Sequence, residues 1–481
     1  MPCSLPQAHT SCHALSSPRT APHATFEEGQ AWAHEHEGCP RACTVADWAL
    51  SNASPPVRWS RLLQGLLAFS SHRLPSAAVA SSVWRERSLR RAIGEQWAAL
   101  VRQRLEEGWR AASACSRRWE GREGQRLLLL DGGAEQMHKN KFVVIDASFI
   151  ARCLGRVLVE PRVRHSRIAP LNRSSSGRLA LHHYWDLQPL CAHSPLLPAR
   201  HFTRELERRG GAAHFWPKRG RAYAGGWRLH SKSAVQAAFR GSEGARLLVL
   251  HDFWRSVRLP DTQVSNKEIE REDSKLPHEG LGLRPSTWEL NPGYEAIASS
   301  LLAQLGGPAN QRTGKSLLAV QWRSEDWEYN DKPRPNEVAN YSVVESLSRC
   351  ALWAARRVRG VMRSHGLRLV FLATDLRPGA SGSYIGGERG SVALEALRRF
   401  ERMVPEARQP YLRGLIDAIP DAGVRSNLEA TICAQAGVLL STTHACQNCK
   451  RAKRCSKMGS AFAQYITRRR AVYGRPTFPL F

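Results

Sequence analysis

The chain has 481 residues, more than one ordinary hydrophobic core supports, so its length predicts two domains and an extension. Its net charge of +28 invites a nucleic-acid interpretation. However, only 11 of the 70 basic residues are lysine, the arginines are scattered along the chain, and no RNA- or DNA-binding motif is present. Nucleic acid is therefore not a predicted partner.

The N-terminal part shows neither a signal peptide nor an apolar stretch of about 18 residues that could span a bilayer. Residues 1–83 are rich in Ser, Pro, Ala and His and lack periodicity, which predicts a disordered low-complexity region. From Trp84 to about Trp119, apolar residues recur every three to four positions, which predicts a basic amphipathic helix or stem within 84–125. Membrane association through this N-terminal region is the alternative to packing on the body.

An apolar strand over Leu127–Leu130 opens the structured part of the chain. It is followed by the glycine pair Gly132-Gly133, a helix over 142–154 and a second strand over Val157–Val159. This order is typical of the start of a doubly wound α/β domain. Paired glycines let the backbone approach a ligand at the helix N-terminus, where free N–H groups favour anions.

The second half alternates strands and helices and is divided from the first at about residue 310. Short apolar strands are predicted at Leu317–Val320, Leu369–Leu372 and Val438–Leu440. Their ends carry polar side chains, and the carboxyl ends of such strands are where open α/β sheets bind ligands. The helices predicted from 292 onward lie at 292–305, 343–361, 391–400, 428–436 and 460–470, and the polar strand ends are Arg323, Asp375, Ser441 and Thr442.

Arg323 is the residue around which we organise the functional prediction. It follows a buried strand, and its planar guanidinium suits an anionic cluster of oxygens such as a diphosphate. The plainer alternative is an ordinary ion pair with Asp326 at a strand end. The convergence of Arg323 with the polar ends of two further strands favours a functional role.

Several short segments match, in order and spacing, the signature segments of one enzyme family. Each match alone is weak, and their shared position at strand ends makes them specific together. The matching segments are Gly132-Gly133-Ala134-Glu135-Gln136, Arg156-Val157-Leu158-Val159-Glu160-Pro161, Gln321-Trp322-Arg323-Ser324-Glu325-Asp326, Ala373-Thr374-Asp375, Glu429-Ala430-Thr431-Ile432-Cys433-Ala434-Gln435-Ala436, Ser441-Thr442, and Ser460-Ala461-Phe462-Ala463. With these segments, spread across roughly residues 126–475, the chain resembles the GDP-fucose protein O-fucosyltransferases.

This resemblance implies an α/β protein with two Rossmann-like lobes of the GT-B glycosyltransferase type. The N-terminal lobe, 126–310, would face the acceptor, and the C-terminal lobe, 311–481, would hold the nucleotide sugar. GDP-fucose would be the donor and a Ser/Thr hydroxyl of a protein the acceptor, with no divalent metal required and no cofactor besides the donor. Arg323 would stabilise the leaving diphosphate.

The resemblance also implies which residues contact the donor. The implied catalytic residues are Arg323, Asp326 and Glu135, and Asp131, Glu135 and Asp326 are the candidates for the general base. The implied donor-binding residues are Gly132, Gly133, Gln136, Gln321, Arg323, Asp375, Glu429, Ser460, Ala461 and Phe462, and no metal ligand is assigned.

Four positions depart from the family pattern. Glu135 stands for an asparagine, Gln321 for a histidine, Glu429 for an aspartate and Ala461 for a threonine. A carboxylate at position 135 would repel a diphosphate unless it is turned away or paired. These departures favour an alternative function, that of an inactive family member that binds a nucleotide or a protein partner.

Two further groups of residues bear on metal and on compartment. The pair His182-His183 suggests a metal, but no further ligand lies at suitable spacing, so a structural role is predicted. The insertion 444–458 holds Cys446, Cys449 and Cys455 beside His444, for which disulfides within the insertion or to Cys433 are expected, with unpaired cysteines and a zinc site as alternatives. The family resemblance implies the lumen of the endoplasmic reticulum or Golgi.

Overall fold

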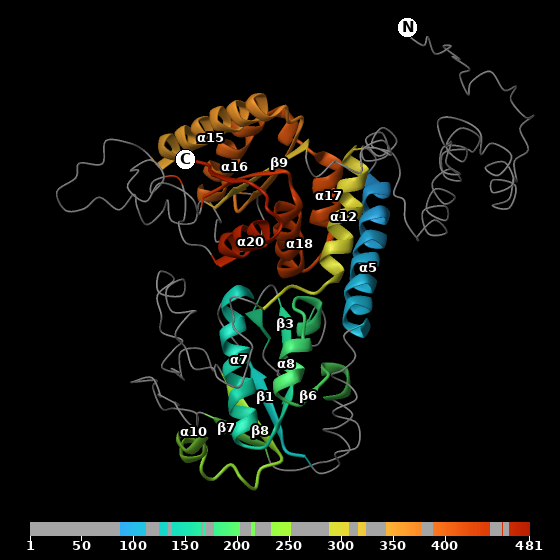
Figure 1. Cartoon of the computed structure of the whole chain (residues 1–481), viewed down its shortest axis with the longest axis vertical. Helices are drawn as coiled ribbons and strands as arrows, with labels where there is room; N and C mark the ends of the chain where they lie inside the picture. Colours follow the sequence, from blue (N-terminus) through green and yellow to red (C-terminus); the bar gives the residue numbers. More distant parts are fainter. Residues whose placement is uncertain are drawn as a thin grey trace, which may run out of the picture. The chain divides into compact units, whose positions relative to one another are not determined.

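The computed structural model describes residues 87–111, 125–132, 137–164, 167–169, 178–202, 213–216, 232–251, 288–306, 316–323, 343–376, 388–442, 455 and 461–481 (Figure 1). The predicted disordered region, 1–83, lies outside these ranges. The chain divides into two compact units, Met1–Ile93 and Gly94–Phe481. Of the helices described, none is long and apolar enough to cross a membrane.

The predicted N-terminal helix is present as α5, Arg87–Ala111. Trp97, Val101, Leu105 and Trp109 recur every four residues along it, and all four side chains are buried. This spacing places them on one face of the helix, and these four residues belong to the core of the second unit. Asn291 fixes the helix further by donating a hydrogen bond of 2.8 Å from its Nδ2 to the carbonyl of Leu105.

The first half of the chain forms a parallel sheet of five strands in the order β6-β2-β1-β8-β7. Its central strands β1 and β8 are almost wholly apolar and buried, as expected where helices cover both faces. The strands are β1 Leu127–Asp131, β2 Val157–Val159, β6 Leu196–Leu197, β7 Ala213–Trp216 and β8 Leu247–His251, with helices α7 Met137–Cys153, α8 Gln188–His193 and α10 Lys232–Ala238.

Helix α7 begins at Met137, five residues before the predicted start. The polar run that opens it, Met137 to Lys141, carries no apolar periodicity, so the sequence pattern missed it. Beside the main sheet lies a small antiparallel sheet, β4-β3-β5, followed by the 3-10 helix η1. These elements are β3 Arg162–Arg164, β4 Arg167–Ile168, β5 Leu179–Ala180 and η1 Leu181–His183.

The second half forms a parallel sheet of four strands in the order β10-β9-β11-β12. The helices α15 and α16 lie side by side on this sheet and pack with it around Trp322 and Phe400 (Figure 1). The elements are β9 Leu317–Trp322, β10 Leu369–Thr374, β11 Val438–Ser441, β12 Thr477–Pro479, α12 Gly293–Gly306, α15 Val343–His365, α16 Glu388–Met403, η2 Pro405–Ala407, α17 Pro410–Ala418, α18 Ala422–Gln435 and α20 Ala461–Val472. The predicted α/β class with two parallel sheets is confirmed.

Helix α18 starts six residues earlier than predicted. Asp421 caps it, because its side chain accepts a hydrogen bond of 2.9 Å from the backbone N–H of Val424. The added stretch, 422–427, holds one large apolar residue, Val424, and so shows no apolar periodicity. Helix α12 packs against α18.

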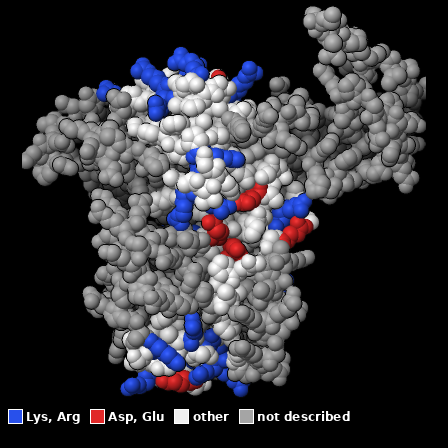
Figure 2. Space-filling model, in the orientation of Figure 1, with Lys and Arg blue, Asp and Glu red and all other residues white. Residues whose placement is uncertain are grey.

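Part of the positive charge of the second half lies on the outer face of α15. Figure 2 shows Lys and Arg side chains gathered over the region of α15 and α16 at the top of the view. On α15 the arginines alternate with a buried apolar stripe, so they form the solvated face of an amphipathic helix. The exposed arginines of α15 are Arg349, Arg356, Arg357, Arg359 and Arg363.

Candidate functional site

The carboxyl ends of β9, β10 and β11 lie at one edge of the second sheet. All three strands are parallel and adjacent, with Thr374 opposite Trp322 and Ser441 opposite Gln321. Arg323 follows Trp322 and Asp375 follows Thr374, so the two residues extend neighbouring strands past the same edge. Neighbouring strands lie about 4.8 Å apart, which places these polar groups within reach of one ligand. The predicted convergence of the three strand ends is confirmed.

Trp322 anchors the end of β9. Its side chain is fully buried, its ring contacts Phe400 and Phe481, and its Nε1 donates a hydrogen bond of 2.9 Å to the carbonyl of Cys455. Because side chains alternate along a strand, Gln321 lies on the opposite face of the sheet from Trp322. Arg323, one residue past the strand, is partly exposed, as a ligand contact requires.

Gln321 ties the ends of β9 and β11 together. Its Oε1 accepts hydrogen bonds from Ser441 Oγ at 3.0 Å, from Thr442 Oγ1 at 3.1 Å and from Thr442 N at 3.3 Å. The side chain is almost fully buried. With its oxygen used inside the lobe, Gln321 has its amide NH₂ to offer a ligand, and its contact with a donor stays a prediction.

Glu429 is paired inside the lobe with a partner that the sequence did not reveal. It forms an ion pair with Arg413 of α17, and both side chains are nearly buried. Burial lowers the pKa of Arg413, but the charges of Glu429 and Asp417 outweigh burial and raise it above its usual value. The i,i+4 pair of Arg413 with Asp417 was visible in the sequence, whereas the contact with Glu429 joins two different helices. The predicted nucleotide contact of Glu429 stays a prediction.

The corresponding edge of the first sheet carries Asp131 and His251 at the ends of β1 and β8. The two residues are directly opposite in register, and the Nδ1 of His251 lies 2.9 Å from Asp131 Oδ2. Asp131 is buried, while the side chain of His251 is 46% exposed. Gly132, next along the chain, has a φ of 90°, a left-handed conformation that favours glycine. Sequence reasoning found Asp131 and Gly132 but missed His251.

Helix α7 of the first half and helix α20 of the second half lie close to each other. Lys141 of α7 is buried, and its Nζ donates a hydrogen bond of 2.6 Å to the carbonyl of Trp288. The same Nζ lies 3.9 Å from the ring centroid of Trp185 and 5.5 Å from that of Tyr465 in α20. The helix that follows the glycine pair therefore lies near the helix that begins at Ala461 and carries the half-buried Phe462.

The remaining predicted site residues lie outside the described ranges. These are Gly133, Glu135, Gln136, Asp326 and Ser460, while Asp375 is described and buried at the end of β10. Their predicted roles stay predictions.

The cysteine pairing differs from the expectation. Cys455, at the end of the insertion, forms a disulfide with Cys350 of α15, 105 residues away, and not with Cys433. Cys433 is unpaired and fully buried in α18, and burial raises the pKa of its thiol. The expected pairing with Cys433 is therefore wrong. Cys455 packs instead into the core around Trp322 and Phe400, where Cys350 is its neighbour. Cys446, Cys449 and His444 lie outside the described residues.

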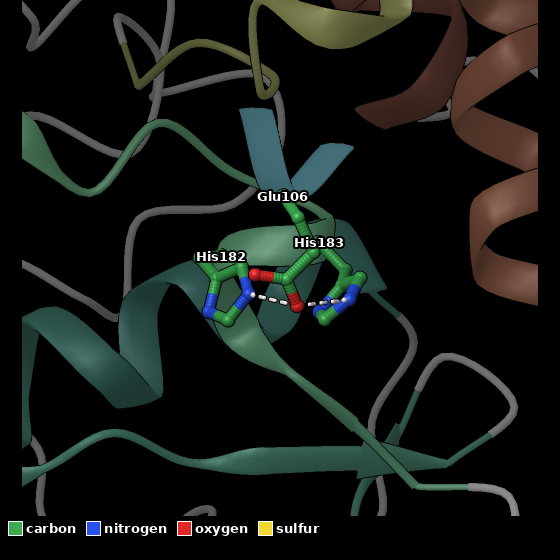
Figure 3. Close-up of side chains that lie close together, drawn as sticks. All are labelled: Glu106, His182 and His183. Atoms are coloured by element: carbon green, nitrogen blue, oxygen red, sulfur yellow. Dashed lines mark hydrogen bonds and ion pairs between the residues drawn. The ribbon is translucent and has the colours of Figure 1, made fainter. Parts of the chain in front are cut away.

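A second cluster of side chains is formed by Glu106, His182 and His183 (Figure 3). Glu106 Oε1 lies 3.2 Å from His182 Nε2 and 3.2 Å from His183 Nε2. Glu106 comes from α5, 76 positions before the histidines, so spacing along the sequence did not reveal it.

No protein-family model and no curated protein matches the sequence. Among solved structures, the chain is similar to apo POFUT1, with 12% identity, a TM-score of 0.40 and coverage of 75% of this chain and 99% of that chain. It is similar to POFUT1 in complex with GDP-fucose, with 14% identity, a TM-score of 0.38 and coverage of 74% and 98%. It is also similar to the fucosyltransferase NodZ from Bradyrhizobium, with 13% identity, a TM-score of 0.32 and coverage of 71% and 93%. Identities and TM-scores this low do not assign a function to this chain.

Proposed function

We propose that this chain is a fucosyltransferase that transfers fucose from GDP-fucose to a Ser/Thr hydroxyl of a protein. The observation that carries the proposal is the position of Arg323, partly exposed at the carboxyl edge of the second sheet, with the ends of two adjacent parallel strands beside it. This edge is where open α/β sheets bind ligands. The segments that resemble the O-fucosyltransferases support GDP-fucose as the donor.

The reaction needs two kinds of group from the protein. The acceptor oxygen attacks C1 of the sugar, the bond from C1 to the diphosphate oxygen breaks, and GDP leaves with the electron pair. Arg323 offsets the negative charge that accumulates on the leaving diphosphate, and the backbone beside Gly132 approaches the donor from the first lobe. The acceptor proton has to pass to a base.

His251 is the base that this arrangement favours. Its Nδ1 contacts the buried carboxylate of Asp131, which holds the ring in one orientation, and its side chain is 46% exposed at the carboxyl edge of the first sheet. Asp131, a predicted candidate for the base, then acts as a positioning residue through His251. Glu135 and Asp326 remain the alternatives.

His251→Gln should lower kcat for GDP release from GDP-fucose, with water as acceptor, by about 10²-fold, the lower end of the range for general bases. The KM for GDP-fucose and the thermal shift with GDP should stay unchanged, because His251 acts on the acceptor. His365→Gln in α15, an exposed histidine, is the matched control and should behave as the wild type. A kcat of His251→Gln equal to that of the control would exclude His251 as the base.

Thermal-shift titration with GDP and GDP-fucose, followed by the hydrolysis assay, separates the enzyme from its alternative. An active transferase should be stabilised by both nucleotides and should release GDP. A chain that is stabilised by GDP but releases none is the inactive nucleotide-binding family member that the changes at positions 135, 321 and 461 favour. No shift with either nucleotide contradicts the proposed donor.

Turnover should survive treatment with EDTA, since Arg323 and not a divalent cation faces the leaving diphosphate in this proposal. The check is kcat before and after chelation at a temperature where the chain stays folded. Complete loss with recovery on adding manganese or magnesium would contradict the metal-independent chemistry. Loss that zinc alone restores would instead indicate a zinc ion that stabilises the fold.

The proposal includes the lumen of the endoplasmic reticulum or Golgi as the site of action. The disulfide between Cys350 and Cys455 supports it, because disulfides persist in oxidising compartments. GDP-fucose and a protein or glycan acceptor are the proposed partners. Membrane association, where it occurs, would act through the N-terminal region.

A further inference from the structure

The cluster formed by Glu106, His182 and His183 brings three ligand atoms to one point (Figure 3). One oxygen of Glu106 lies 3.2 Å from the Nε2 of each histidine, and the three atoms lie within 4.8 Å of one another. Both imidazole side chains are at least nine-tenths buried, while the Glu106 side chain is 31% exposed. Two elements far apart in the sequence, α5 and η1, supply these groups.

The partner of Nδ1 on each imidazole ring determines which ring nitrogen carries the proton. His182 Nδ1 lies 2.7 Å from Glu160 Oε1, and His183 Nδ1 lies 3.2 Å from the carbonyl of Ala180. Both partners are acceptors, so each Nδ1 is the donor. In the neutral rings, each Nε2 then directs a lone pair toward the oxygen of Glu106, an arrangement that a proton or a metal cation between them would stabilise.

A proton between His182 Nε2 and Glu106 Oε1, which lie 3.2 Å apart, satisfies only part of this arrangement. Among the described residues, however, His183 Nε2 has no hydrogen-bond partner, although it lies 3.2 Å from Glu106 Oε1. A buried, unpartnered nitrogen that faces the same oxygen calls for a cation that contacts all three atoms.

We propose that Glu106, His182 and His183 together bind one zinc ion. Two imidazole nitrogens and one carboxylate oxygen form a ligand set typical of zinc. Ligands bound tetrahedrally at the usual zinc distances lie about 3.3 Å from one another, which the two separations of 3.2 Å match. Because the Glu106 side chain is 31% exposed, water would serve as the fourth ligand.

The surroundings of the two rings match those of metal-bound histidines. Such histidines donate their second N–H to a carboxylate or a backbone carbonyl, and here Glu160 and Ala180 provide one of each. Glu160 is itself held, since it accepts backbone hydrogen bonds of 2.9 Å from His182 and from Ala199. The ligands are therefore oriented by the fold.

The proposed ion has a structural role. It ties α5 to the segment that follows the small antiparallel sheet, beside the stacking of Trp109 on His182. A ligand that binds the folded state alone stabilises it in proportion to the logarithm of its concentration over its Kd, so zinc should raise the melting temperature. Loss of the ion should loosen α5 and leave the diphosphate edge of the second sheet intact.

The test uses the full-length chain, stripped with a chelator and titrated with zinc chloride, with bound metal measured by elemental analysis after dialysis. Because the cysteine insertion is a second possible zinc site, all variants carry Cys446→Ser and Cys449→Ser. The parent should bind one equivalent of zinc and gain in melting temperature. Cobalt in its place should show no thiolate charge-transfer band, since the ligands are nitrogen and oxygen.

Glu106→Gln removes one ligand charge while keeping the size of the side chain, and should weaken zinc affinity at least about tenfold. Glu107→Gln, the exposed neighbour on the same helix, is the matched control and should bind zinc as the parent does. His183→Gln serves as a second ligand variant, and melting temperatures without zinc show that each variant is folded. Absence of stoichiometric zinc in the parent, or unchanged affinity in folded Glu106→Gln, would overturn the proposal.

Discussion

Arg323→Ala is expected to lower kcat for GDP-fucose hydrolysis by about 10²–10³-fold, equivalent to roughly 3–4 kcal/mol of transition-state stabilisation. The guanidinium lies past the end of a fully buried strand and is partly exposed at the edge where Asp375 and Thr442 lie. Charge builds up on the diphosphate as the bond from C1 breaks, so the loss should fall on kcat more than on KM. Steady-state kinetics and melting temperature, measured on the same protein, check both parts.

Arg323→Lys keeps the charge but loses the planar pair of donors, so it should recover only part of the rate. Arg402→Ala, which removes an exposed arginine paired with Glu395 in α16, is the matched control and should leave kcat unchanged. If Arg323 is only an ion-pair partner of Asp326, Arg323→Ala and Asp326→Ala should lower the melting temperature equally. A variant Arg323→Ala with normal stability and normal kcat would show that this arginine has no role in catalysis.

Local apolar runs were enough to predict the strands that frame the site. Leu317–Val320 and Leu369–Leu372 are short, continuous and apolar, and both became buried parallel strands. Because parallel strands end at the same edge, the meeting of their polar ends followed from the strand assignment alone. Arg323 and Asp375, which directly follow two of these strands, are therefore predicted to lie together.

Contacts between distant segments were beyond the reach of the sequence pattern. Glu106 and His182 are 76 positions apart in the sequence, and they meet only because helix α5 packs against the segment that carries the histidine. The ion pair of Glu429 with Arg413 and the disulfide of Cys350 with Cys455 likewise depend on how helices pack. His251 stands at the end of a predicted strand, so comparing strand ends in the first lobe, as in the second, would have found it.

Arg470→Met is expected to lower the free energy of unfolding by roughly 4 kcal/mol, the largest effect on stability that we anticipate. The Arg470 side chain is fully buried in α20, and burial lowers its pKa to about 10, so it is charged at neutral pH. The Arg470 guanidinium donates to six acceptors, all of which lie at the end of α18 or at the start of β11 and β12. They are the carbonyls of Cys433 at 2.9 Å, Ala434 at 3.3 Å, Ala436 at 2.5 Å, Gly437 at 3.1 Å and Pro476 at 2.6 Å, and Thr477 Oγ1 at 3.1 Å.

The last carbonyls of a helix lack partners within it, and a cation at that end is favourable, so methionine at 470 would leave several buried acceptors unsatisfied. Arg470→Lys offers one compact donor group to the same set and should lose nearly as much. Arg468→Met, two residues earlier and exposed, is the matched control and should change stability by less than about 0.5 kcal/mol. Urea denaturation with unchanged m-values provides the measurement, and equal midpoints for Arg470→Met and Arg468→Met would contradict this account.

Since β11 begins one residue after Gly437 and ends at Ser441, we expect Arg470→Met to loosen the hydrogen bonds that Gln321 accepts and, with them, the edge that carries Arg323.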